Sequence, residues 1–94
     1  MQIESIRDKK LRRLATNSDR RVMEAQRLLD MLTFIAAATS IEELGTPPNF
    51  GFHELKGDRK GTFAMTVTRN WRMTFTMPSG GTVADMDLED YHGD

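Results

Sequence analysis

The longest regular pattern of hydrophobic positions lies between residues 19 and 38. Apolar side chains recur there at steps of three and four residues, which is the spacing of one face of an α-helix. The central positions are Val22, Ala25, Leu29, Leu32 and Ala36, and Leu28 and Ile35 widen the stripe. The stripe is flanked by Met23, Met31 and Phe34. These side chains could form the margin of a core or part of a partner contact. The pattern predicts an amphipathic helix over 19–38 that packs one face on a sheet.

Two shorter elements are predicted before this helix. Residues 2–6 favour a short first strand, and residues 7–15 have the apolar spacing of a short, very basic helix. Its apolar positions are Leu11, Leu14 and Ala15. Residues 16–18 end this helix and offer a cap for the long one. Asp19 would then lie in the first turn of the long helix, where the helix dipole favours a negative charge.

A loop separates the helical half from the rest of the chain. Residues 41–44 can add one turn of helix, and the adjacent prolines within 45–49 prevent its continuation. Residues 50–58 are irregular or begin a strand.

The period of the hydrophobic pattern then changes from 3.6 to 2. Apolar and polar residues alternate over 63–68, 71–76 and 83–89, with breaks at 69–70 and 78–81. This pattern predicts an antiparallel meander of three strands. The apolar positions on the last strand are Ala84, Met86 and Leu88. The opposite, polar face is expected to carry the threonines, Arg72 and the aspartates.

Helices followed by a sheet predict an α+β fold, with N-terminal helices packed on a small antiparallel β-meander. The 94 residues suffice for one small domain, 1–94. Absence of cysteine excludes disulfides and thiolate metal sites. No apolar run approaches the roughly 20 residues of a membrane span, and the N-terminus lacks the pattern of a signal peptide. A cytoplasmic protein is therefore expected.

The net charge of −1 conceals an uneven distribution of charge. Residues 1–72 hold all 13 Lys and Arg against 9 Asp and Glu, a net charge of +4. Residues 73–94 hold 5 acids and no Lys or Arg, a net charge of −5. A basic face can bind a polyanion such as RNA. The alternative is that both regions are simply solvated surfaces.

The two histidines, His53 and His92, stand beside other polar groups at the two ends of the predicted sheet. If the last strand lies near the segment that enters the meander, these groups share one edge. The combined cluster would be His53, Lys56, Arg72, Asp90, Tyr91 and His92. Metal-free RNA cleavage needs a base for the ribose 2′-OH, cations for the phosphorane and an acid for the leaving oxygen. Arg59 and Lys60 are further candidates for binding RNA phosphates.

Two other interpretations of these residues remain. His53, Asp90 and His92 could ligate zinc, although their spacing matches no standard zinc motif. Residues 56–61 could be only a charged turn that contains glycine. The glycines match neither a P-loop nor a dinucleotide-binding fingerprint.

Three short motifs together resemble the HigB family of bacterial toxins in the RelE superfamily. They are LKGDRKG at residues 55–61, NWRMTF at 70–75 and EDYH at 89–92. The resemblance covers about residues 50–92 by motif, while the helical half matches by layout and by its Pro-Pro loop. It implies the RelE-like microbial ribonuclease fold. It also implies an endonuclease that cuts mRNA in the ribosomal A site without a metal or organic cofactor.

The resemblance also implies which residues act. The family's active residues correspond here to His53, Lys56, Asp90, Tyr91 and His92. Arg72 matches an arginine near the site, and Trp71 matches a position expected in the core. We expect His92 or Asp90 to act as base, Lys56 and Arg72 to hold the phosphate, and Tyr91 to orient the substrate. Gly93-Asp94 extends beyond the usual end of the family.

The implied partner is HigA, a helix-turn-helix antitoxin, and the complex would bind operator DNA through HigA alone. Ribosome and mRNA are the other expected partners. A basic surface formed by residues 7–13 with Arg20, Arg21 and Arg27 is a candidate for ribosomal RNA or for an acidic antitoxin segment.

Three functions are consistent with these motifs. The first is a ribosome-dependent endoribonuclease. The second is a weak or inactive toxin homologue that acts as a binding module or corepressor, because a fold does not determine function. The third is a ribonuclease that needs no ribosome, which is disfavoured because the predicted site has few groups to activate the 2′-OH unaided.

Overall fold

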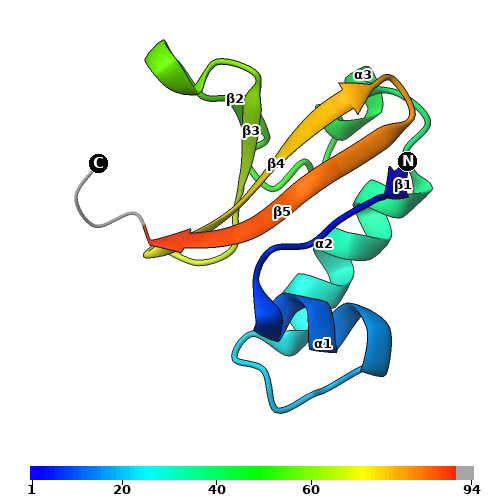
Figure 1. The fold of residues 1–94 in the computed structure, drawn as a ribbon, viewed down its shortest axis with the longest axis vertical. Helices are drawn as coiled ribbons and strands as arrows, with labels where there is room; N and C mark the ends of the chain where they lie inside the picture. The colour runs from blue at the N-terminus through cyan, green and yellow to red at the C-terminus, as the bar shows by residue number, and fades with distance from the viewer. Residues whose placement is uncertain (91–94) are drawn as a thin grey trace.

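A five-stranded sheet with helices on one side forms the framework of the protein in a computed structural model that describes residues 1–90 (Figure 1). The strands are β1 (Gln2–Ile3), β2 (His53–Glu54), β3 (Thr62–Thr66), β4 (Trp71–Ser79) and β5 (Thr82–Asp90). The helices are α1 (Lys9–Asn17), α2 (Ala25–Ala37) and α3 (Ile41–Leu44), and a 3₁₀ turn, η1, spans Gly57–Arg59. The strand order is β1-β5-β4-β3-β2, with β1 parallel to β5 and the other pairs antiparallel. The predicted α+β meander with N-terminal helices is confirmed.

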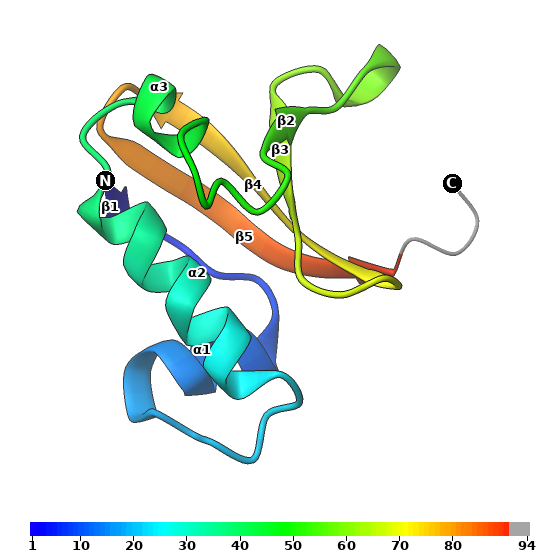
Figure 2. The same ribbon diagram turned by 180° about the vertical axis from the view of Figure 1, so that it is seen from behind.

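Helices cover one face of the sheet. Helix α2 lies along the β4–β5 side, with α1 packed beside it. The view from behind shows β2 and η1 at the other end of the molecule from α1 (Figure 2). Within residues 1–90, no helix has the length and apolar character to cross a membrane.

Helix α2 begins six residues later than the 19–38 prediction. Ser18 adopts a left-handed conformation and its N–H bonds to carbonyls of α1, so it caps the end of α1 instead of the start of α2. Asp19 therefore lies in the connection between α1 and α2, not in the first turn of a helix. The buried face comprises Ala25, Leu28, Met31, Leu32 and Ile35. Met31 is thus central to the core, while Ala36, which was predicted in the stripe, is exposed.

A β-bulge in β5 changes which side chains reach the core. Thr74 pairs with Asp87 but Thr76 pairs with Ala84, so β5 has one extra residue over this stretch. Asp85 has a φ of 53° at this irregularity. Val83 consequently joins Met86 in the core cluster, whereas Ala84, although buried as predicted, pairs with Thr76 and lies outside that cluster.

Aromatic packing holds β2 on the rest of the sheet. The rings of Phe52, Phe63 and Phe75 stack with centroid separations of 5.5 to 6.3 Å. Trp71 is 42% exposed at the start of β4, so the expectation that it belongs to the core is wrong. The reason is that Trp71 is the first residue of β4 and pairs with Asp90, the last residue of β5, so it lies at an end of the sheet.

Candidate active site

The polar face of the sheet brings His53, Arg72 and Glu89 to the same side. His53 pairs with Ala64, which pairs with Thr74 on β4. Two residues before Thr74 on β4, Arg72 pairs directly with Glu89 on β5. Residues that are paired across strands share a face, and their chain neighbours Phe63, Met73 and Phe75 belong to the core cluster on the other side.

Glu89 is the centre of a polar cluster on this face. Both guanidinium NH₂ groups of Arg59 donate to its carboxylate at 2.6 Å. Arg72 donates to Oε1 at 3.3 Å, and the Thr74 hydroxyl donates to Oε2 at 2.6 Å. The pKa of Glu89 is lowered from 4.5 to about 2, mainly by the hydrogen bonds from Arg59, with help from Thr74, the charge of Arg59 and Arg72, while burial opposes the shift. Arg72 and Thr74 are buried, which strengthens these contacts.

The turn around η1 carries Arg59 back over the sheet. Gly57 and Gly61 have φ values of 70° and 97°, conformations that glycine adopts without strain. The Gly61 N–H donates to the Glu54 carboxylate at 2.9 Å, and this bond closes the turn. The closed turn therefore brings Arg59 into contact with Glu89, which lies thirty residues later in the sequence.

Two lysines and a histidine lie within residues 53–60, the segment that contains β2 and η1. Lys56 and Lys60 are exposed and line an open depression of about 370 Å³ together with residues 54, 55 and 57. His53 is exposed, and its Nδ1 lies 2.8 Å from the carbonyl oxygen of Gly51. A carbonyl can only accept, so Nδ1 carries the hydrogen and Nε2 is left for another partner.

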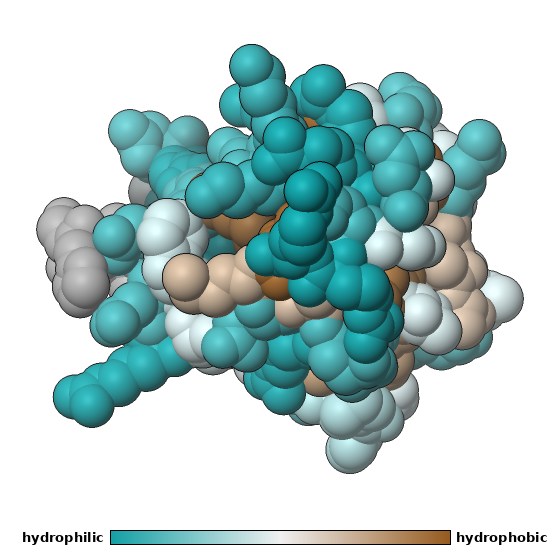
Figure 3. Space-filling view, turned by 90° about the horizontal axis from the view of Figure 1, so that it is seen from below, coloured by the Kyte–Doolittle hydropathy of each residue, from teal (hydrophilic) through white to brown (hydrophobic). Residues whose placement is uncertain are grey.

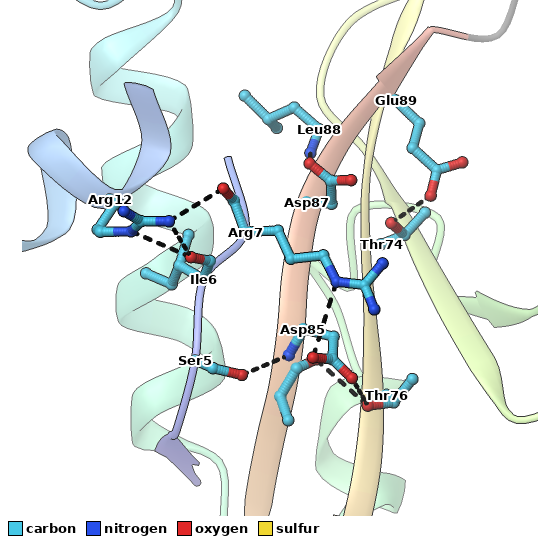
Figure 4. Close-up of polar contacts among 11 residues, drawn as sticks. Ser5, Ile6, Arg7, Arg12, Thr74, Thr76, Asp85, Asp87, Leu88 and Glu89 are labelled. Atoms are coloured by element: carbon cyan, nitrogen blue, oxygen red, sulfur yellow. Dashed lines mark hydrogen bonds and ion pairs between the residues drawn. The ribbon is translucent and has the colours of Figure 1, made fainter. Parts of the chain in front are cut away.

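Arginines from distant segments form ion pairs with acidic residues of β5. Figure 4 shows Arg7 reaching across β5 to Asp85, with an Nε–Oδ1 separation of 3.7 Å, and Thr74 donating to Glu89. Arg7 precedes α1, and Arg12 donates to the carbonyls of Ile6 and Arg7. The basic and acidic parts of the chain thus meet on this sheet. Among residues 1–90, no group of three or more His, Cys, Asp or Glu is arranged to hold a metal ion.

The sequence matches, over residues 4–92, the family model described as the RelE-like toxin of type II toxin-antitoxin system HigB. The chain belongs to the HigB-like toxin family. It is 41% identical over 69 residues to endoribonuclease HigB of Proteus vulgaris, and the match covers 73% of each chain.

Solved structures identify the fold independently of the sequence motifs. YafQ from E. coli strain BL21(DE3) superposes with a TM-score of 0.64 at 16% identity, covering 95% of this chain and 91% of YafQ. A YafQ mutant from E. coli superposes with a TM-score of 0.63 over the same shares of the chains, also at 16% identity. The expected RelE-like fold of this HigB-like toxin is thereby confirmed. A toxin of a type II system has an antitoxin as its partner.

The structure brings together only part of the predicted site. His53 and Arg72 lie on the polar face, and Arg59 reaches it through Glu89. Asp90 pairs with Trp71, and alternation along β5 directs it to the side opposite Glu89. The sheet therefore separates Asp90 from Arg72. Tyr91 and His92 lie outside the described residues.

Glu89 itself was absent from the predicted catalytic and RNA-binding residues. The signal was present in the sequence, because Glu89 opens the EDYH motif and the meander places β5 beside the strand of Arg72. An acidic side chain carries no direct signal of a phosphate-binding site, and only the contacts of Glu89 with Arg59 and Arg72 reveal it as their common acceptor.

Proposed function

We propose that this HigB-like toxin is a ribosome-dependent endoribonuclease that cuts mRNA in the ribosomal A site. It would act in the bacterial cytoplasm as one toxin domain, 1–94, until a HigA-type helix-turn-helix antitoxin neutralises it. Any contact with operator DNA would run through the antitoxin. The relative from Proteus vulgaris is named an endoribonuclease, which supports this activity. The observation that carries the proposal is the convergence of Arg59 and Arg72 on one face with His53.

The reaction would be attack of a ribose 2′-OH on the adjacent phosphorus. A base takes the proton of the 2′-OH, the P–O5′ bond breaks, and an acid protonates the leaving 5′ oxygen, which leaves a 2′,3′-cyclic phosphate. Arg59, Arg72, Lys56 and Lys60 supply positive charge for the extra negative charge of the phosphorane. Arg72 would act mainly through its charge, because its side chain is buried and already donates to Glu89. The scheme uses only acid-base chemistry and cations, so it needs no metal or organic cofactor.

His53 and the C-terminal residues would share the proton transfers. His53 is suited to move a proton because an imidazole can accept and donate a proton through its ring nitrogens, and its Nε2 is left for a partner. Of the two expected bases, His92 and Asp90, we propose His92, with Tyr91 orienting the substrate, because Asp90 lies on the opposite side of the sheet from Arg72.

Glu89 would act as a positioning residue for the two arginines. It accepts from Arg59 through both oxygens and from Arg72 through one, so both guanidinium groups are held before the RNA arrives. Groups that are fixed in advance stabilise a transition state better than groups that must be ordered during the reaction.

The test is cleavage of a defined mRNA by the purified toxin on programmed ribosomes, mapped by primer extension. We expect cuts within the A-site codon, and loss of these cuts in Lys56→Ala. The control is Glu42→Ala, an exposed residue of α3 that should cleave as the wild type does. Intact mRNA with the wild-type toxin would favour the inactive binding module, and cutting of naked RNA would favour the ribosome-independent ribonuclease.

A further inference from the structure

An open groove of about 500 Å³ lies between α1 and the turn that leads to α2. Its lining residues are Lys10, Arg13, Asp19, Arg21, Val22 and Met23. In Figures 1 and 2, α1 and this turn lie at the end of the molecule away from η1. Figure 3 views this end, where apolar surface is visible between hydrophilic side chains. The groove is thus separate from the proposed catalytic face.

The positive charge beside this groove is unfavourable at the N-terminus of α1. Helix α1 places Lys9, Lys10, Arg12 and Arg13 within its first five residues and holds no acidic residue. Cations near a helix N-terminus oppose the helix dipole, and like charges three or four positions apart repel. Such an arrangement is more favourable once an external anion is bound.

Contacts within the fold neutralise only part of this charge. Arg21 donates to Asp19 at 2.9 and 3.1 Å, and Arg13 lies 3.8 Å from the same carboxylate. One carboxylate therefore serves two arginines, and Lys10 forms no ion pair within residues 1–90. The groove keeps a positive charge that a partner can match.

Exposed apolar atoms beside these cations indicate the class of partner. Met23 is 78% exposed and lines the groove next to the half-buried Val22. A phosphate backbone gains little from an exposed methionine, whereas an amphipathic protein segment gains from burying it. The combination of cations with an apolar surface favours a protein over RNA.

We propose that this groove binds an acidic, amphipathic segment of the antitoxin. Carboxylates of that segment would meet Lys10, Arg13 and Arg21, and one of its apolar side chains would cover Met23. The proposal rests on the antitoxin partnership stated under the proposed function. It adds the surface and the chemistry of the contact.

The experiment is calorimetric titration of the toxin with its cognate antitoxin. To keep catalysis out of the measurement, all toxins carry Lys56→Ala. We expect Lys10→Glu with Arg13→Glu, and separately Met23→Asp, each to weaken binding by about tenfold or more. Met23→Leu and the exposed turn variant Arg69→Glu should bind within about threefold of the parent, since most changes outside an interface are close to neutral. Circular dichroism melting curves identify any variant that fails to fold.

Unchanged antitoxin binding by both Met23→Asp and the charge-reversal variant would overturn the proposal. A second contrary result would be normal antitoxin binding with weakened binding to ribosomes, which would assign the groove to RNA. Neither result depends on mRNA cleavage. Failure of the endoribonuclease function would appear only in the cleavage assay and would leave this titration unaffected.

Discussion

Arg59 and Glu89 are thirty residues apart in the chain and are joined by two hydrogen bonds of 2.6 Å. This contact fastens the 3₁₀ turn η1 to β5 across the polar face of the sheet. Arg72 and Thr74 share the same carboxylate, so one side chain connects three segments of the proposed site. The strength of this connection can be measured through both stability and catalysis.

Glu89→Gln should lower kcat for mRNA cleavage by about tenfold or more without raising KM. The amide cannot accept from both NH₂ groups of Arg59, so the arginines lose their orientation but keep their charge for binding RNA. Single-turnover cleavage on programmed ribosomes separates the two constants. Asp87→Asn, on the same strand, is the matched control. A rise in KM with unchanged kcat would show that Glu89 does not position these groups for the transition state.

The stability of the protein should fall with acid in a window set by Glu89. Its pKa in the folded protein is about 2, below the ordinary value of 4.5, so the ionised form stabilises the fold. This contribution is complete above pH 4.5 and is lost as the pH falls toward 2. Because solvent screens the partly exposed carboxylate, the contribution should be at most about 2 kcal/mol. Urea unfolding at a series of pH values measures it. Glu89→Gln should show a shallower pH dependence over this window, and equal curves for both proteins would contradict the assignment.

His53→Ala should reduce mRNA cleavage by about a hundredfold while changing the free energy of unfolding by no more than about 0.5 kcal/mol. The side chain is exposed, and its hydrogen bond to Gly51 is local, so folding depends little on it. Cleavage assays and urea unfolding of the same preparations give both values. Asp58→Asn, an exposed change in η1, is the control that should preserve both. Full activity in His53→Ala would remove this histidine from the mechanism.

Two aromatic residues of β4 should differ sharply when replaced by alanine. Phe75 is fully buried and stacks with Phe52 and Phe63, so Phe75→Ala should cost about 3–5 kcal/mol. Trp71 is 42% exposed, and Trp71→Ala should cost about 1 kcal/mol or less. Denaturant unfolding of the two variants tests the difference. Equal losses would place Trp71 in the core, as the sequence suggested.

The sequence by itself determined the order of the elements and most of their faces. The spacing of apolar residues placed a long helix before a three-stranded meander, because hydrophobic periods of 3.6 and 2 are local properties of the chain. The Pro-Pro loop and the glycine-bearing turn at residues 57–61 were also readable, since proline and glycine act on the backbone at their own positions. The three motifs that resemble HigB toxins likewise lie in continuous stretches of sequence.

Only the tertiary structure decided the details that depend on contacts between distant segments. The bulge at Asp85 moved Val83 into the core because strand register is set by the pairing of β4 and β5. Ser18 caps the end of α1, and α2 begins only at Ala25, after the left-handed Glu24. The apolar spacing, which continues back to Val22, does not mark this break. The contact between Arg59 and Glu89 requires the twisted sheet and the turn of η1 together. No pattern within a short window of sequence contains that information.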